Sequence, residues 1–162
     1  MFHKVLVPFD IRFIPKNALH AAAALAHAGA ELTLLYVADV AADFAHAAFT
    51  PISQEEVDSY GARVNQKIDN VLALLAEFGA TASVYSVRKS PSHTAINEVA
   101  KAMMADVVVM GTHGRRGLSR LWNGSVTECV IRDADVPVMV IRESSRKPFF
   151  PRIPGAATPP LG

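Results

Sequence analysis

The segment Gly111–Thr127 contains three glycines within its first seven residues and a Gly-Ser pair further on. Glycine allows the backbone to approach an anion closely, and the first turn of a helix offers amide donors at the positive end of its dipole. No Asp or Glu occurs between residues 107 and 127, whereas the cationic or titratable side chains there are His113, Arg115, Arg116 and Arg120. This combination predicts a site that binds phosphate.

Each of these features also has a purely structural explanation. Ser125 and Glu128 have the spacing of a capping box, which alone accounts for a serine at the start of a helix. Glycines that follow a strand can serve only to make a turn, and arginines can simply be solvated. The combined spacing after one apolar strand is what favours an anion site.

The surrounding sequence predicts alternating strands and helices. Short apolar, β-branched runs indicate strands at Lys4–Phe9, Glu31–Val37, Thr81–Val87, Asp106–Met110 and Pro137–Arg142. Helical spacing, capping signals and terminal glycines indicate helices at Asn17–Ala28, Ser53–Phe78, Ser92–Met104 and Ser125–Arg132. The order βαβαβαβαβ predicts an α/β fold with a single open five-stranded parallel sheet and helices on both faces, a Rossmann-like arrangement.

Ligands of such sheets bind outside the carboxyl ends of the strands, where the strand order reverses. The loops that follow Phe9, Val37 and Met110 are therefore the expected positions of a site.

Composition narrows the classes of partner. The chain has 16 basic and 15 acidic residues, so no global field favours nucleic acid or an anionic membrane, and neither partner is expected. A single cysteine, Cys129, cannot form an internal disulfide, and the apolar run Val5–Val7 is too short for a signal peptide. A cytoplasmic location is expected. The spacing of His20, His27 and His46 predicts no metal site.

The length predicts one folded domain, and a change of composition from Arg146 onward places its expected bounds at residues 1–145. Five of the ten prolines fall in the last 17 residues, so residues 146–162 are expected to form a proline-rich C-terminal tail.

The motif Gly111-x2-Gly114-x9-Gly124-Ser125 resembles the signature of the universal stress protein family, in its ATP-binding branch. The flanking segments KVLVPFD, VVVMGTHG and GSVTECVIRDADVPVMVIR are similar to the family as well, and the resemblance covers about residues 2–143. The same resemblance implies a fold like that of the adenine nucleotide α-hydrolases.

The resemblance implies a set of nucleotide contacts. Asp10 takes the place of the acidic ribose or adenine contact, and Val37 the place where backbone groups recognise adenine. Together with Arg115 from the cationic segment, the expected nucleotide-binding residues are Pro8, Phe9, Asp10, Val37, Met110, Gly111, His113, Gly114, Arg115, Gly124, Ser125, Val126 and Thr127. The family also implies a homodimer that forms through the last strand, Pro137–Arg142.

The sequence departs from the family pattern at two turns. Bulky Ile11 and Phe13 follow Asp10 where small polar residues are usual, and they could narrow or cap the pocket. Arg88-Lys89-Ser90 replaces a glycine that often follows the third strand.

These observations lead to an adenine nucleotide-binding protein, holding ATP or AMP with or without Mg, that acts in stress response or signalling through nucleotide-dependent conformation. Little or no turnover and no catalytic residue are expected. One alternative is a dimeric regulatory module with an empty pocket. A slow ATPase is another, with Asp10 as the nearby acidic candidate. The first strand is followed by neither of the motifs usual in α-hydrolase enzymes, and no Walker P-loop is present.

Overall fold

The computed structural model describes residues 1–11, 13–38, 52–89, 91–113 and 126–143. Five strands form the sheet: β1 (Lys4–Phe9), β2 (Glu31–Ala38), β3 (Ser83–Arg88), β4 (Val107–His113) and β5 (Val138–Glu143). The described helices are α1 (Lys16–His27), α3 (Gln54–Glu77), α4 (Ser92–Ala102) and α5 (Val126–Asp133). Every predicted element is present, with ends shifted by a few residues. The predicted tail at 146–162 lies outside the described residues.

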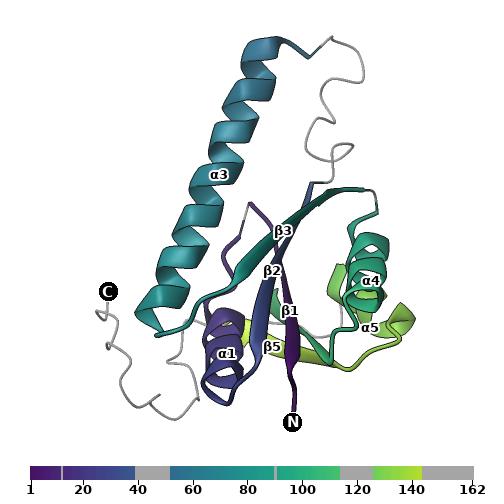
Figure 1. Cartoon of the computed structure of the whole chain (residues 1–162). Helices are drawn as coiled ribbons and strands as arrows, with labels where there is room; N and C mark the ends of the chain where they lie inside the picture. The colour runs from purple at the N-terminus through teal and green to yellow at the C-terminus, as the bar shows by residue number, and fades with distance from the viewer. Residues whose placement is uncertain (12, 39–51, 90, 114–125, 144–162) are drawn as a thin grey trace.

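All five strands run parallel in the order β3-β2-β1-β4-β5, which confirms the predicted open sheet. Starting from β1, the chain moves outward through β2 to β3, crosses back to β4 beside β1, and ends at β5 (Figure 1). The direction of winding therefore reverses between β1 and β4.

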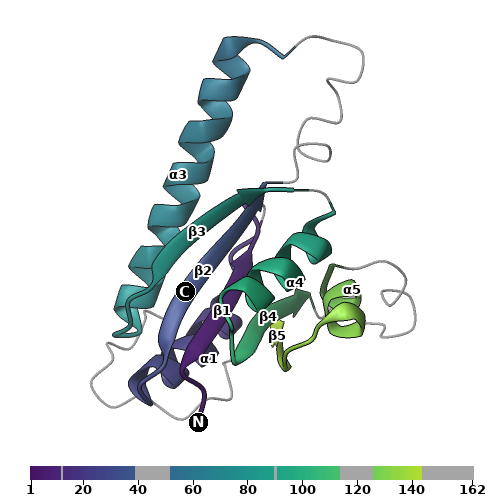
Figure 2. The same ribbon diagram turned by 45° about the vertical axis from the view of Figure 1, so that its right-hand side comes forward.

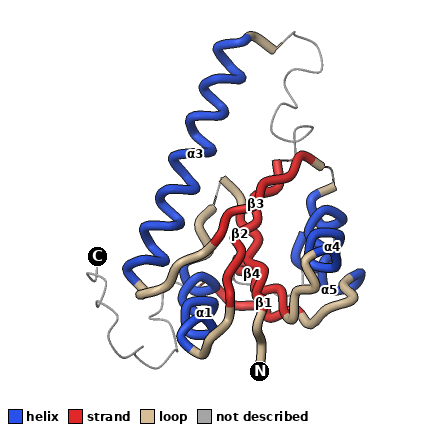
Figure 3. The backbone as a smooth tube through the Cα atoms, viewed as in Figure 1, coloured by secondary structure: helices blue, strands red, loops and turns tan. Residues whose placement is uncertain are grey.

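The helices cover both faces of the sheet, as Figure 2 and the tube in Figure 3 show. Side chains of α1 and α3 pack on one face in a large core that includes Val7, Leu34 and Val109. Those of α4 and α5 pack on the other face around Leu6, Leu35 and Val108. The central strands are buried on both faces, so their uninterrupted apolar runs are those of an interior parallel strand.

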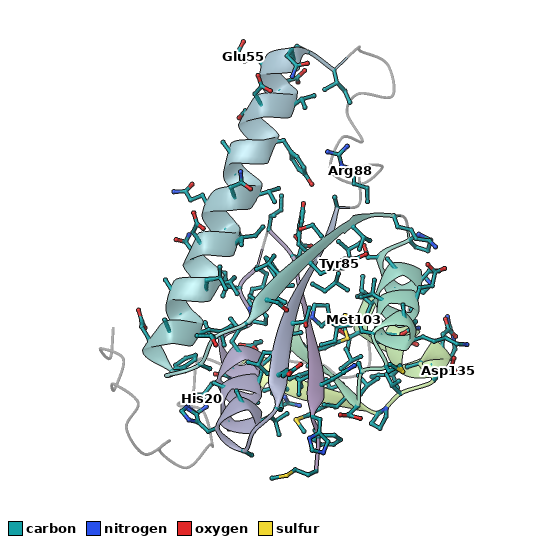
Figure 4. The ribbon with its side chains drawn as sticks, viewed as in Figure 1. His20, Glu55, Tyr85, Arg88, Met103 and Asp135 are labelled. Atoms are coloured by element: carbon teal, nitrogen blue, oxygen red, sulfur yellow. The ribbon has the colours of Figure 1, made fainter. Side chains whose placement is uncertain are left out.

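Helix α3 begins with the predicted capping box. The Ser53 hydroxyl accepts a hydrogen bond from the Glu56 amide, and the Glu56 carboxylate accepts one from the Ser53 amide. With 24 residues the helix is about 36 Å long. Its amino-terminal half extends past the carboxyl edge of the sheet, with Glu55 near the tip (Figures 1 and 4).

The opposite, amino edge of the sheet is fastened by Asp106. Its carboxylate accepts hydrogen bonds from the amides of His3 (2.6 Å) and Lys4 (2.8 Å). The bonds from Lys4 and His3 lower the pKa of this carboxyl below its usual value. The Asp106 carboxylate joins the start of β1 to the start of β4, so its lowered pKa reflects a structural role.

Candidate site at the switch point

The reversal of winding places the candidate site between the carboxyl ends of β1 and β4. Phe9 ends β1, and the stretch Met110–His113 forms the end of β4. The end of β2, with Val37, lies directly beside β1. Three loops predicted to carry the site thus start from adjacent strands at one edge of the sheet, where open α/β sheets bind their ligands.

The strands β1 and β4 separate towards this edge. Pairing between β1 and β2 covers all six residues of β1, whereas pairing between β1 and β4 covers only Val5 and Leu6 with Val107 and Val108. In this register the next step requires the amide of residue 8 to donate to the carbonyl of Val109. Residue 8 is proline and has no N–H, so the ladder ends at that point. Pro8 thereby accounts for the end of the pairing between β1 and β4 before the carboxyl end of either strand.

The turn after β1 folds back onto the core. Phe9 is buried, and its ring centroid lies 5.8 Å from that of Tyr36 on β2. The carbonyl of Asp10 accepts a hydrogen bond from the amide of Phe13 (3.1 Å), which closes the turn. Ile11 and Ile14 are half-buried and pack against the α1–α3 core. The bulk that departs from the family pattern is therefore partly absorbed by the core.

The side chain of Met110 is not available to line a pocket. It is buried in the core beneath α4 and α5, and Val37 packs against the same core. A ligand at these two positions would meet main-chain groups, as the family resemblance implies for Val37. His113 ends β4 in register with Glu143.

At the start of α5, Val126 is exposed and Thr127 is half-buried. Gly114, Arg115, Gly124 and Ser125 lie outside the described residues, so their place in a phosphate-binding loop stays a prediction. The structure does fix where that loop leaves β4 and where it enters α5, and both points belong to elements that flank the switch point.

Gly111 has a role that sequence reasoning missed. A Cβ built at this position would lie 2.7 Å from Cβ of Pro15 and 2.9 Å from Oε1 of Glu143. The absent side chain therefore lets α1 and the end of β5 approach β4 closely. Gly111 is not among the described glycines with positive φ. The need for a glycine here therefore comes from the close packing around it, and its backbone conformation does not require one.

The second departure from the family pattern, Arg88-Lys89-Ser90 after the third strand, contacts α4 through Lys89. Arg88 is the last residue of β3 and is exposed near the carboxyl edge of the sheet (Figure 4). The ammonium of Lys89 forms an ion pair with the carboxylate of Glu98 on α4. Among the described residues, no group of three His, Cys, Asp or Glu side chains is arranged to hold a metal ion, and no helix is long and apolar enough to span a membrane.

The strand order, with its reversal between β1 and β4, defines an open, doubly wound α/β domain. The profile of the Universal stress protein family matches residues 1–142, and the chain belongs to that family.

Individual relatives cover nearly the whole chain. Universal stress protein MJ0531 of Methanocaldococcus jannaschii is 27% identical over 154 residues, covering 91% of this chain and 86% of that protein. Universal stress protein YxiE of Bacillus subtilis is 29% identical over 152 residues, covering 88% and 100%. The solved structure of the hypothetical protein MJ0577 has a TM-score of 0.68 at 27% identity, covering 90% of this chain and 99% of that one.

Two solved universal stress proteins hold adenine nucleotides. One is a complex with cAMP, with a TM-score of 0.59 at 22% identity, covering 88% of this chain and 98% of that one. The other, from Archaeoglobus fulgidus, is a complex with dAMP, with a TM-score of 0.61 at 16% identity, covering 86% and 97%. At these identities the likeness establishes a shared fold.

The crowding at Gly111 gives a first prediction. Gly111→Ala should lower the free energy of unfolding by about 1–3 kcal/mol, the usual cost of overpacking, because the new Cβ meets Pro15 and Glu143. Urea denaturation of the variant measures it. Gly61→Ala is the matched control, since Gly61 lies within α3 with open space around it, and there alanine should stabilise by about 0.5–1 kcal/mol. Equal effects of the two substitutions would contradict the spatial role of Gly111.

A second prediction concerns Pro8. In Pro8→Ala the new amide should donate to the carbonyl of Val109 and extend the β1–β4 ladder by one step. Net stability should change little, because one hydrogen bond contributes about 1 kcal/mol and the loss of proline costs a similar amount through the unfolded state. Amide hydrogen exchange measured by NMR is therefore the informative readout. The new amide at residue 8 should be protected as well as that of Phe9, which faces β2; rapid exchange at residue 8 would show that proline does not end the ladder.

Proposed function

We propose that this protein binds an adenine nucleotide, ATP or AMP, across the switch point between β1 and β4. The nucleotide would act on conformation in stress response or signalling in the cytoplasm, with little or no turnover. The observation that supports this most is that the Gly111-x2-Gly114-x9-Gly124-Ser125 segment starts on β4 at its carboxyl end, on the strand next to β1. Adenosine would lie near Pro8, Phe9, Asp10 and Val37.

The chemistry of the described residues suits binding better than hydrolysis. Asp10 is the acidic residue of the first turn, and Glu143 is the other carboxylate at this end of the described structure beside Gly111. The carboxylate of Glu143 already accepts two backbone hydrogen bonds from α1, so it is poorly placed to orient an attacking water. The cAMP and dAMP complexes of related proteins support the choice of an adenine nucleotide.

Nucleotide binding is tested on the full chain. Protein purified without added nucleotide is denatured, and the supernatant is separated on an anion-exchange column to find any released adenine nucleotide. Melting curves with ATP, ADP and AMP, each with and without Mg, then follow. A ligand at a hundred times its Kd should stabilise by about 2.7 kcal/mol, which corresponds to a shift of roughly 5–10 °C for a domain of this size.

Two variants make the result specific. Gly124→Asp places a carboxylate in the predicted phosphate loop and should abolish the shift, whereas Gly61→Asp, at a position of α3 with open space around it, should leave it unchanged. No shift with any nucleotide would reject the proposal in favour of a regulatory module with an empty pocket. Steady phosphate release above background would instead support a slow ATPase.

The edge strand β5 supports a homodimer in the same proposal. It is the last strand of the sheet beside β4, and Val140 is 38% exposed on it. Within the described residues this edge of β5 has no neighbouring strand, and antiparallel pairing of two copies of β5 would cover both edges.

A charge at this edge should prevent the pairing. Val140→Lys is expected to convert a dimer into a monomer, because two ammonium groups would be brought together across the twofold axis. Size-exclusion chromatography with light scattering measures the mass. Val84→Lys is the control, since Val84 is equally exposed but lies on β3 at the other edge. A wild-type monomer, or a dimer dissociated only by Val84→Lys, would rule out the β5 interface.

A further inference from the structure

The carboxylate of Glu143 is inserted into the start of α1. Oε2 accepts a hydrogen bond from the amide of Asn17 and Oε1 one from the amide of Ala18, each at 2.9 Å. The side-chain amide of Asn17 in turn donates to the carbonyl of Arg142 at 2.9 Å. Three hydrogen bonds thus join the last two residues of β5 to the first turn of a helix about 125 residues earlier in the chain.

Helix α1 has no cap of its own. Its N-cap residue is Pro15, which provides no side-chain hydrogen bond, and its first turn contains no acidic residue. The first amides of a helix lack partners within the helix and lie at its positive end, so a carboxylate is the favoured occupant. Glu143 supplies this missing cap from another element.

The same carboxylate lies against β4. Its Oε1 is 2.9 Å from the position that a Cβ on Gly111 would occupy, and Cβ of Pro15 is 2.7 Å from that position. The start of α1, the end of β4 and the end of β5 therefore meet around one carboxylate. Because the turn closed by Asp10 and Phe13 leads directly into α1, a contact that fixes the start of α1 also restricts that turn at the carboxyl end of β1.

The position of the carboxylate also affects where phosphate can bind. In many open α/β domains the start of the helix that follows the first strand is an anion site. Here the chain's own carboxylate holds the amides of Asn17 and Ala18. A phosphate at that point would have to displace Glu143 and would meet its charge, so the anion site of α1 is closed.

We infer that Glu143 is a positioning residue of the switch-point site: it caps α1 internally, holds the turn after β1 against β4 and β5, and keeps phosphate away from the start of α1. The effect on nucleotide affinity rests on the proposed function, whereas the cap itself can be tested without any nucleotide. Glu143 acts through the position of Asp10 and Gly111, without contact to the nucleotide.

The experiment compares the full-length wild type with Glu143→Ala, Glu143→Gln and the control Glu31→Ala. Glu31 is an exposed carboxylate at the start of β2, at the amino edge of the sheet. The first readout is hydrogen exchange by NMR at the amides of Asn17 and Ala18, referenced to the Leu34 amide in the core. Exchange in Glu143→Ala should be about tenfold to a hundredfold faster, as expected for the loss of charge-assisted hydrogen bonds.

Glu143→Gln keeps the shape of the side chain and one acceptor oxygen but loses the charge, so its exchange rates should fall between those of wild type and Glu143→Ala. It also keeps the test decisive if the alanine variant fails to fold. Sodium acetate, compared with sodium chloride at equal ionic strength, should slow the exchange in Glu143→Ala and leave wild type and Glu31→Ala unchanged. Unaltered rates at Asn17 and Ala18 in the folded variants would overturn the inference.

The second readout is the Kd for AMP and ATP by calorimetry. Glu143→Ala should weaken binding by about fivefold or more, and Glu31→Ala should not change it. Faster exchange combined with an unchanged Kd would overturn the positioning role. If wild type binds no nucleotide, the proposed function fails, and the exchange and acetate results alone decide whether the cap exists.

Discussion

The ladder between β1 and β4 requires an amide donor at every second residue of β1, and Pro8 cannot provide the one that should follow Leu6. Pairing stops at Leu6 and Val108, while the opposite side of β1 pairs with β2 along its full length. The gap coincides with the point where the chain reverses its winding. The missing amide hydrogen of Pro8 thus ends the β1–β4 pairing beside the point where open α/β sheets bind their ligands.

The rest of the fold holds the central strands and the start of α1 in place around the end of the β1–β4 pairing. The central strands are buried on both faces, so α1 with α3 and α4 with α5 hold their positions from opposite sides. Gly111 brings β4 close to the start of α1, and the carboxylate of Glu143 fixes that start to β5. The strands at the switch point can therefore separate at their carboxyl ends and remain packed elsewhere.

Sequence reasoning identified the elements of this arrangement well, because their signals are local. The β-branched run of β4 and the capping box at Ser53 are read within a few neighbouring residues. The contact of Glu143 with α1 could not be read in that way, since it joins residues about 125 positions apart and depends on the register between β4 and β5. One local signal points to such a contact: the helix that starts at Pro15-Lys16-Asn17 has no capping side chain of its own, so a cap from another element is expected.

The residues at the switch point also explain why a motif predicts a site there while side-chain chemistry alone does not. Pro8 and Gly111 act by what they lack, an amide hydrogen and a Cβ, and the side chain of Met110 is part of the core. A site of this kind offers main-chain groups and space to its ligand. Such groups recognise a base and a phosphate by hydrogen bonds, yet none of them can transfer a proton near neutral pH. The nearby carboxylate of Glu143 is occupied by α1. Within the described residues, the geometry at the switch point therefore provides main-chain hydrogen-bonding groups and a Glu143 carboxylate that α1 already engages.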